Sequence, residues 1–198
     1  MSEPGREANV LGALALAVAD HSARTVAAAS GQSPSAVAAL CALHEFLDRP
    51  TLDELCRVLG LTPSGAVRLV DRLARAGLVT RTPGDDRRSR AVVLTDEGRR
   101  LAAELSATRA RTLEGLLNGL SGDERKTLHS LLGRVMANVV EAKDGGAWIC
   151  RLCDLAACGR AEGHCPAANA AARRYGPVPG APQPRPAQSA RRPPSTVT

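Results

Sequence analysis

Four of the chain's six cysteines fall within a stretch of sixteen residues. Cys150, Cys153, Cys158 and Cys165 follow the spacing Cys-x2-Cys-x4-Cys-x6-Cys, and His164 stands beside the last of them. Four thiolates are a common ligand set for a structural zinc ion and for an iron–sulfur cluster. Neighbouring thiols of low pKa can instead form a regulatory disulfide. Because only one Cys-x2-Cys pair is present, the spacing leaves zinc, an iron–sulfur cluster, a redox pair and no site at all as alternatives.

Arginines form the second group of residues with evident chemistry. Arg87, Arg88 and Arg90 follow the turn signal Pro83–Asp86, so they belong to the tip of an expected hairpin. Guanidinium groups on a short hairpin suit a DNA minor groove or the phosphates beside it. Asp86 stands two residues before Arg88, where its carboxylate can hold that guanidinium in a fixed orientation.

The positive charge of the chain is concentrated in two segments. Residues 57–111 carry a net +6 and residues 173–198 a net +5, whereas residues 1–56 and 112–172 carry −4 and −1. A localised basic segment is typical of nucleic-acid binding. The chain has one Phe, one Trp and one Tyr, which argues against modules that stack single-stranded bases on aromatic side chains. The pattern therefore favours double-stranded DNA.

Hydrophobic periodicity and capping residues predict the elements that must position these groups. Thr51 with Glu54 forms a capping-box pattern, and Thr62 before Pro63 is an N-cap followed by a first-turn proline. The expected order is helices over 9–30, 34–49, 51–60 and 63–76, strands over 78–82 and 90–94, and helices over 96–120 and 121–143. This order predicts a mainly α fold, a winged helix-turn-helix flanked by long N- and C-terminal helices.

The expected helix over 63–76 is the one that would enter a major groove. Its apolar positions form one inward stripe and leave polar groups at its start and along its outer side. The candidates for DNA contact there are Thr62, Ser64, Gly65, Arg68 and Arg72. Arg68 suits a guanine or a phosphate, and Ser64 suits either DNA or the helix terminus. Asp71 lies at helical spacing from Arg68 and Arg75, so we expect ion pairs within the helix.

Three runs of the chain together resemble the MarR family of bacterial transcriptional regulators. They are VDRLARAGLVTR over 70–81, DDRRSR over 85–90 and LTDEG over 94–98, and the resemblance covers about residues 8–143. It implies a homodimer formed by the first helix and the last two helices, which binds an inverted-repeat operator and most often represses transcription. It also implies that Arg88 enters the minor groove while Asp86 orients it, and that a small-molecule effector binds between the head and the dimer region. Two-fold symmetry independently suits the long apolar helices.

These observations divide the chain into three expected segments. Residues 8–145 form a winged-helix DNA-binding and dimerisation domain, 146–172 a cysteine-rich extension, and 173–198 a disordered tail rich in Pro, Ala and Arg. No stretch reaches the ~18 apolar residues of a membrane span, and the N-terminus lacks a basic signal-peptide region, so we expect a cytoplasmic protein without membrane contact. No general base accompanies the cysteines, so we expect no enzyme. The predicted function is a DNA-binding regulator, with a metal- or redox-responsive sensor over 150–165 as the alternative.

Overall fold

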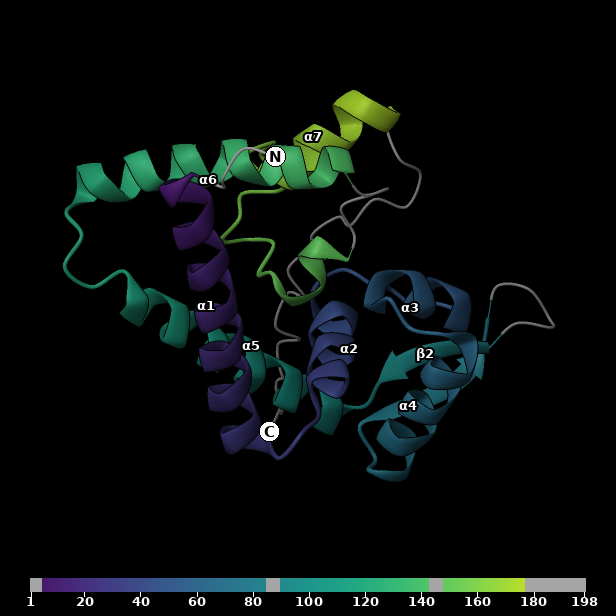
Figure 1. Ribbon diagram of the computed structural model, residues 1–198. Helices are drawn as coiled ribbons and strands as arrows, with labels where there is room; N and C mark the ends of the chain where they lie inside the picture. Colours follow the sequence, from purple (N-terminus) through teal and green to yellow (C-terminus); the bar gives the residue numbers. More distant parts are fainter. Residues whose placement is uncertain (1–4, 85–89, 143–147, 177–198) are drawn as a thin grey trace, which may run out of the picture.

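The computed structural model describes residues 5–84, 90–142 and 148–176, and most of them are helical (Figure 1). The elements follow in the order α1 (Arg6–Ser30), α2 (Pro34–Glu45), α3 (Leu52–Leu59), α4 (Pro63–Arg75), β1 (Val79–Pro83), β2 (Arg90–Leu94), α5 (Asp96–Leu116), α6 (Gly122–Ala142), the 3-10 turn η1 (Ile149–Leu152) and α7 (Pro166–Tyr175). β1 and β2 pair antiparallel directly after α3 and α4. The predicted mainly α winged helix is therefore confirmed.

Side-chain caps set the starts of the helices in the head. The Thr51 hydroxyl accepts a hydrogen bond from the Glu54 amide at 3.3 Å, and the Glu54 carboxylate accepts one from the Thr51 amide at 2.8 Å. This reciprocal pair satisfies amide groups that the first turn of α3 leaves without helical partners. Gly60 then ends α3 with a φ of 64°, a left-handed conformation in which glycine lacks the strain of other residues.

Two elements of the cysteine region were not predicted from the sequence. These are η1 and α7, which begins at Pro166 behind Cys165 as its N-cap. α7 continues to Tyr175, so the boundary expected between residues 172 and 173 falls inside this helix. Residues 177–198 of the expected tail lie outside the described residues.

The winged-helix head has one aliphatic core. Leu40 and Leu43 of α2, Leu55 of α3, Leu73 of α4 and Val92 of β2 are each at most 1% exposed within it. Burying an aliphatic side chain of this size stabilises a fold by about 1.5–3 kcal/mol relative to leaving it exposed. The core therefore fixes α4 with one apolar side inward and its polar side outward.

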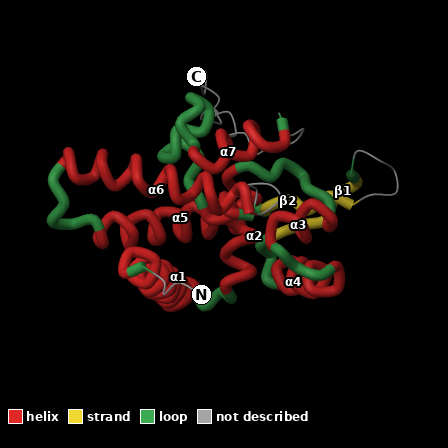
Figure 2. The backbone as a smooth tube through the Cα atoms, turned by 45° about the horizontal axis from the view of Figure 1, so that its top comes forward, coloured by secondary structure: helices red, strands yellow, loops and turns green. Residues whose placement is uncertain are grey.

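The long helices lie on the side of the head away from the hairpin. α1 packs against α5, α5 leads away from the head, and α6 returns toward it from a loop at the far end (Figures 1 and 2). By length and mean hydropathy, α1 could cross a membrane. The sequence alone predicts no membrane span, because that expectation requires about 18 consecutive apolar residues. Only 11% of the most apolar window of α1 is buried inside the chain. An apolar face of α1 is thus left uncovered.

The cysteine region packs onto the head as a second core. Cys150, Leu155 and Cys165 are buried there against Phe46, the C-cap of α2, and Val140 of α6. Ala42, Val58 and three alanines of α7 complete this cluster. The region is therefore an integrated part of the fold, in contact with both the head and the long helices.

Candidate nucleic-acid interface and cysteine cluster

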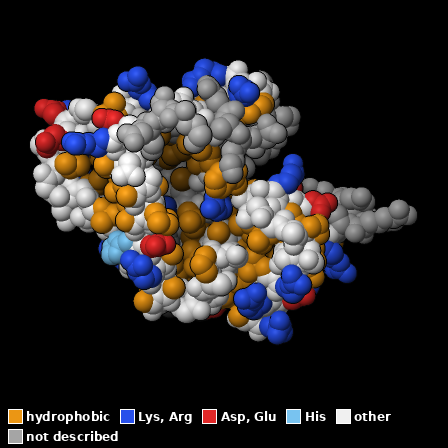
Figure 3. Space-filling model, in the orientation of Figure 1, with side chains coloured by type: hydrophobic (Ala, Val, Ile, Leu, Met, Phe, Trp, Pro, Cys, Tyr) orange, Lys and Arg blue, Asp and Glu red, His pale blue; other side chains and the backbone are white. Residues whose placement is uncertain are grey.

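α4 presents a basic side to solvent. Its buried stripe consists of Ala66, Leu69, Val70 and Leu73. Arg68, Arg72 and Arg75 are exposed, and Arg68 and Arg72 have no ion-pair partner among the described residues. Lys and Arg side chains gather over α4 at the lower right of the space-filling view (Figure 3). Unpaired guanidinium groups on an exposed helix are free to contact phosphates and base edges.

The start of α4 divides the predicted contact residues by role. The Thr62 hydroxyl accepts a hydrogen bond from the Gly65 amide at 3.2 Å, so Thr62 is the N-cap of the helix. A β-carbon added at Gly65 would lie 3.1 Å from that hydroxyl oxygen, which explains the small residue at this position. Ser64 is exposed, with its hydroxyl 3.4 Å from that of Thr62. Thr62 therefore caps the helix, and the hydroxyl of Ser64 does not.

The expected ion pairs within α4 are wrong. The Asp71 carboxylate accepts a hydrogen bond from Arg81 of β1 at 2.6 Å, and Arg75 donates instead to the Asp71 carbonyl at 3.4 Å. The reason is that the hairpin folds back beside α4 and brings Arg81 within reach. The pair is half-exposed, so its effect is to position α4 against the wing more than to stabilise the fold.

Backbone contacts hold the base of the wing. The Val92 amide donates to the Pro50 carbonyl at 2.9 Å, and the Arg49 guanidinium donates to the Pro83 carbonyl at 2.6 Å. Arg49 and Arg81 thus position the wing, and the sequence reasoning missed both. Arg81 lies within the quoted 70–81 run, which is a signal that could have singled it out.

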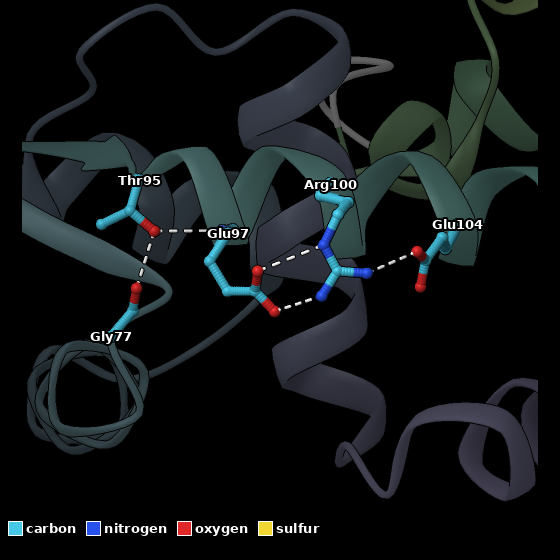
Figure 4. A network of polar contacts seen from close by, with 6 residues as sticks. Gly77, Thr95, Glu97, Arg100 and Glu104 are labelled. Carbon is cyan, nitrogen blue, oxygen red and sulfur yellow. Dashed lines mark hydrogen bonds and ion pairs between the residues drawn. The ribbon is translucent and has the colours of Figure 1, made fainter.

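The start of α5 is fastened to the end of α4. The Thr95 hydroxyl donates to the Gly77 carbonyl at 2.6 Å and accepts from the Gly98 amide at 3.0 Å (Figure 4). Farther along α5, Arg100 contacts both Glu97 and Glu104. A single hydroxyl therefore joins the N-terminus of α5 to the turn that precedes β1.

The predicted wing-tip residues lie mostly outside the described residues. These are Asp86, Arg87 and Arg88. Arg90 is described, pairs with Pro83 at the last rung of the hairpin and is exposed.

Comparison with known proteins identifies the fold. The sequence model of the MarR family matches residues 33–89, from the N-cap of α2 to the end of the wing tip. The winged-helix region therefore resembles the MarR family in sequence. A crystal structure of the transcriptional regulator PA3341 is 29% identical with a TM-score of 0.55 and covers 68% of this chain and 98% of its own.

Two further MarR-family structures agree. A MarR family protein from Bacillus stearothermophilus is 25% identical with a TM-score of 0.57, and covers 66% of this chain and 91% of its own. Wild-type MarR from E. coli in its apo form is 26% identical with a TM-score of 0.51, and the match covers 63% of this chain and 96% of that protein. About a third of this chain lies outside each match. The winged-helix part of the chain is therefore similar to MarR-family regulators, and the chain carries additional sequence.

Four cysteines lie near one another in the second core. The Cys150 sulfur is in hydrogen-bonding contact with those of Cys153 and Cys165, and Cys165 also contacts Cys158. The sulfurs therefore form a connected series in the order Cys153, Cys150, Cys165, Cys158. The predicted group of four cysteines is brought together, although no three ligand-type side chains among the described residues already surround one centre.

Hydrogen bonds distribute the protons within this cluster. The contact with Cys150 lowers the pKa of Cys165 to about 5, with the Ala168 amide adding to the effect. The same neighbour, Cys150, lowers the pKa of Cys153 to about 7. The contact with Cys153 raises the pKa of Cys150, and burial raises that of Cys158 to about 12. Cys153 and Cys165 are therefore the more acidic thiols of the cluster.

His164 is separate from the sulfurs. Its ring and Cβ lie over Gly159, and a β-carbon added there would be 3.0 Å from the His164 Nδ1 atom. Gly159 has a φ of 62° and forms the turn after Cys158. The imidazole therefore packs on this turn, and no contact joins it to a sulfur among the described residues.

Proposed function

We propose that this chain is a homodimeric repressor of the MarR family that binds an inverted-repeat operator in double-stranded DNA. The observation that carries the proposal is the exposed Arg68 and Arg72 on α4, which have no ion-pair partner among the described residues, beside a wing that three contacts anchor. In this arrangement the N-terminal half of α4 reads the major groove and the wing reaches the adjacent minor groove. A cytoplasmic location follows from the same role and is proposed with it.

The homodimer is supported by the uncovered apolar side chains of the long helices. On α1 they are Val10, Leu11, Leu14 and Leu16, and on α6 they are Leu131, Leu132, Val135 and Val139, each between 38% and 66% exposed. Hydrophobic side chains gather along α1 and below α6 in the space-filling view (Figure 3). A contiguous apolar surface of this kind is typical of a subunit interface.

Selection of bound fragments from a genomic DNA library, followed by binding titrations at several salt concentrations, tests the proposal. Removing a charge that contacts a phosphate reduces the salt slope, whereas removing a base contact relaxes sequence preference. We expect Arg88→Ala to weaken operator binding and to reduce the slope of log K against log salt by about 1. We expect Arg68→Ala to reduce the preference for the operator over unrelated DNA.

Arg111→Ala is the matched control, because Arg111 is exposed on α5 and bonds only to Thr108 among the described residues. This variant loses the same charge away from the proposed interface, so its operator affinity and salt slope stay at the wild-type values. Recovery of no preferred sequence, or equal losses in all three variants, would contradict the assignment of α4 and the wing.

A second candidate function is a sensor in which the cysteine region controls DNA binding. It is favoured by two contacts of that region with the head. The Leu155 amide donates to Glu45 of α2 at 3.3 Å, and Arg109 of α5 donates to the Leu152 carbonyl at 3.1 Å. A change at the cysteines therefore has a short route to α2. A small-molecule effector between head and long helices stays a prediction from the family.

A further inference from the structure

The cysteine cluster lies in the second core, apart from α4 and the wing. Its four sulfurs come from η1, from the residue after η1, from the following turn and from the N-cap of α7. Successive elements thus place four soft ligands in one region of the second core. The exposed fraction of both Cys150 and Cys165 is 2%.

We propose that Cys150, Cys153, Cys158 and Cys165 bind one Zn2+ ion, which fastens the segment from η1 to α7 onto the winged-helix head. Zinc bonds of roughly 2.3 Å to four tetrahedral sulfurs set the sulfurs about 3.8 Å apart. The contacts of Cys150 with Cys153 and Cys165, and of Cys165 with Cys158, already place the four sulfurs beside one another in series. Cys153 and Cys158 stand at the ends of the series and are less buried, so rotation of these two side chains closes the shell.

The surroundings of the sulfurs supply the positive charge that such a site needs. A zinc ion with four thiolates carries a net charge of −2. Arg160 donates to the Cys150 sulfur at 3.6 Å and to the Cys165 sulfur at 3.9 Å. The buried Nε of Arg109 has no hydrogen-bond partner among the described residues, and its charge acts on Cys153. Two guanidinium groups therefore balance the charge of the proposed centre.

An amide group supports the same centre. The Ala168 N–H donates to the Cys165 sulfur at 3.5 Å, in the first turn of α7. Hydrogen bonds of this kind orient metal ligands and stabilise thiolate charge. α7 therefore begins at the proposed metal ligand, and its position on α6 depends on that ligand.

The geometry favours zinc over the other cysteine chemistries. Sulfurs that contact their neighbours in series leave room for one ion, whereas an iron–sulfur cluster inserts several iron and sulfide atoms between its four cysteines. A disulfide uses two of the four sulfurs and is rare in the reducing compartment where a DNA-binding regulator works. All four sulfurs converge, as a tetrahedral zinc site requires.

A zinc ion would also stabilise the segment from η1 to α7, which has a small apolar core. Its buried residues are mainly small, namely Ala167, Ala170 and Ala171 beside Leu155. Alanine side chains bury little apolar area, and η1 spans only four residues. Small units with little core are commonly held by a metal ion, whose binding free energy then contributes to folding.

Metal analysis of the full-length protein tests the proposal. The protein is purified anaerobically without added metal, and zinc, iron and acid-labile sulfide are measured per chain. We expect one zinc per chain in the wild type, loss of that zinc in Cys150→Ser and Cys165→Ser, and retention in the matched controls Cys41→Ser and Cys56→Ser. Iron with sulfide, or a zinc-free protein with an internal disulfide on peptide mapping, overturns the proposal.

Cobalt binding by the wild-type chain keeps the test independent of how the variants fold. Zinc is removed with a chelator and Co2+ is added as the spectroscopic probe. We expect thiolate-to-cobalt charge-transfer absorption with the visible bands of a tetrahedral ion, and recovery of amide-exchange protection in α7. Octahedral cobalt spectra, or zinc that persists in all the cysteine variants, overturns the assignment. Operator binding is measured separately, so failure of the zinc proposal leaves the DNA-binding proposal intact.

Discussion

Gly98 allows α5 to pack closely against the start of the hairpin. A β-carbon placed on it would lie 1.9 Å from the Leu78 carbonyl oxygen, so α5 and the start of the hairpin could not keep their present approach. Gly98→Ala is expected to lower the free energy of unfolding by about 1–3 kcal/mol, the usual range for overpacking. Urea unfolding followed by circular dichroism measures this change.

Gly115→Ala is the control for that substitution, because it lies in the same helix with nothing within 4 Å of an added β-carbon. Its expected effect is a gain of roughly 0.5–1 kcal/mol from the lower entropy of the unfolded chain. A loss of similar size in both variants would show that helix propensity, and not the approach to Leu78, governs position 98.

Glu45 gives the junction between α2 and the cysteine region a pH dependence. Burial raises the pKa of its carboxyl above the ordinary value, against the opposing hydrogen bond from the Leu155 amide. The contribution of Glu45 to stability is therefore fully present below its unfolded pKa and is lost as pH rises through the raised folded value. The Glu45→Gln variant has no carboxyl to ionise and does not undergo this loss. The free energy of unfolding of the variant minus that of the wild type should therefore become more positive as pH rises from about 4 to 7.

Unfolding titrations at four pH values across that range measure the effect. Glu162→Gln, which removes the same charge from an exposed site beside the cysteines, corrects for the general change in net charge. A difference between wild type and Glu45→Gln that does not vary with pH would contradict the role assigned to burial.

Thr95 links elements at the next scale, because its hydroxyl caps α5 and also donates to the carbonyl of Gly77. Thr95→Ala removes both hydrogen bonds and should reduce the free energy of unfolding by about 1–2 kcal/mol. Thr95→Ser keeps the hydroxyl and should stay within about 0.5 kcal/mol of wild type. Exchange of the Gly98 amide, followed by NMR, reports the cap directly. Equal amide protection in the alanine variant would contradict the assigned bond.

The elements show how far sequence reasoning reaches. Local signals specified the helix starts, because a cap such as Thr51 with Glu54 acts within four residues of the chain. The apolar stripe of α4 likewise predicted its exposed arginines. Asp71 was assigned the wrong partner because helical spacing considers only the helix, whereas Arg81 reaches it by the fold of the hairpin. α7 was missed although Pro166 and the alanines after it favour a helix.

The convergence of the cysteines belongs to the whole molecule. Their spacing gave the ligand count, but the path of the turns between Cys153 and Cys165 decides whether the sulfurs meet. That path depends on packing against Phe46 and Val140, more than 10 residues away along the chain. Local sequence patterns do not report contacts between residues so far apart in the chain. The sequence therefore left zinc, an iron–sulfur cluster, a redox pair and no site as alternatives.

The proposed dimer is also a property of the whole molecule. Leu14 on α1 and Leu132 on α6 are 53% and 47% exposed, and both belong to the uncovered apolar face. The double variant Leu14→Glu, Leu132→Glu places four charges in a two-fold interface, where unpaired buried charge is strongly unfavourable. We expect the wild type to sediment as a dimer and the double variant as a monomer with an unchanged helical spectrum.

Ser130→Glu is the matched control, since Ser130 is exposed on another side of α6 and should leave the dimer intact. The monomeric variant should also lose the advantage of an inverted repeat over a single half-site, because that advantage comes from tethering two reading heads. Its affinity for one half-site should change little, since α4 and the wing are far from both substitutions. A double variant that stays dimeric would place the interface elsewhere on the molecule, whereas a wild-type monomer would remove the basis for a symmetric operator.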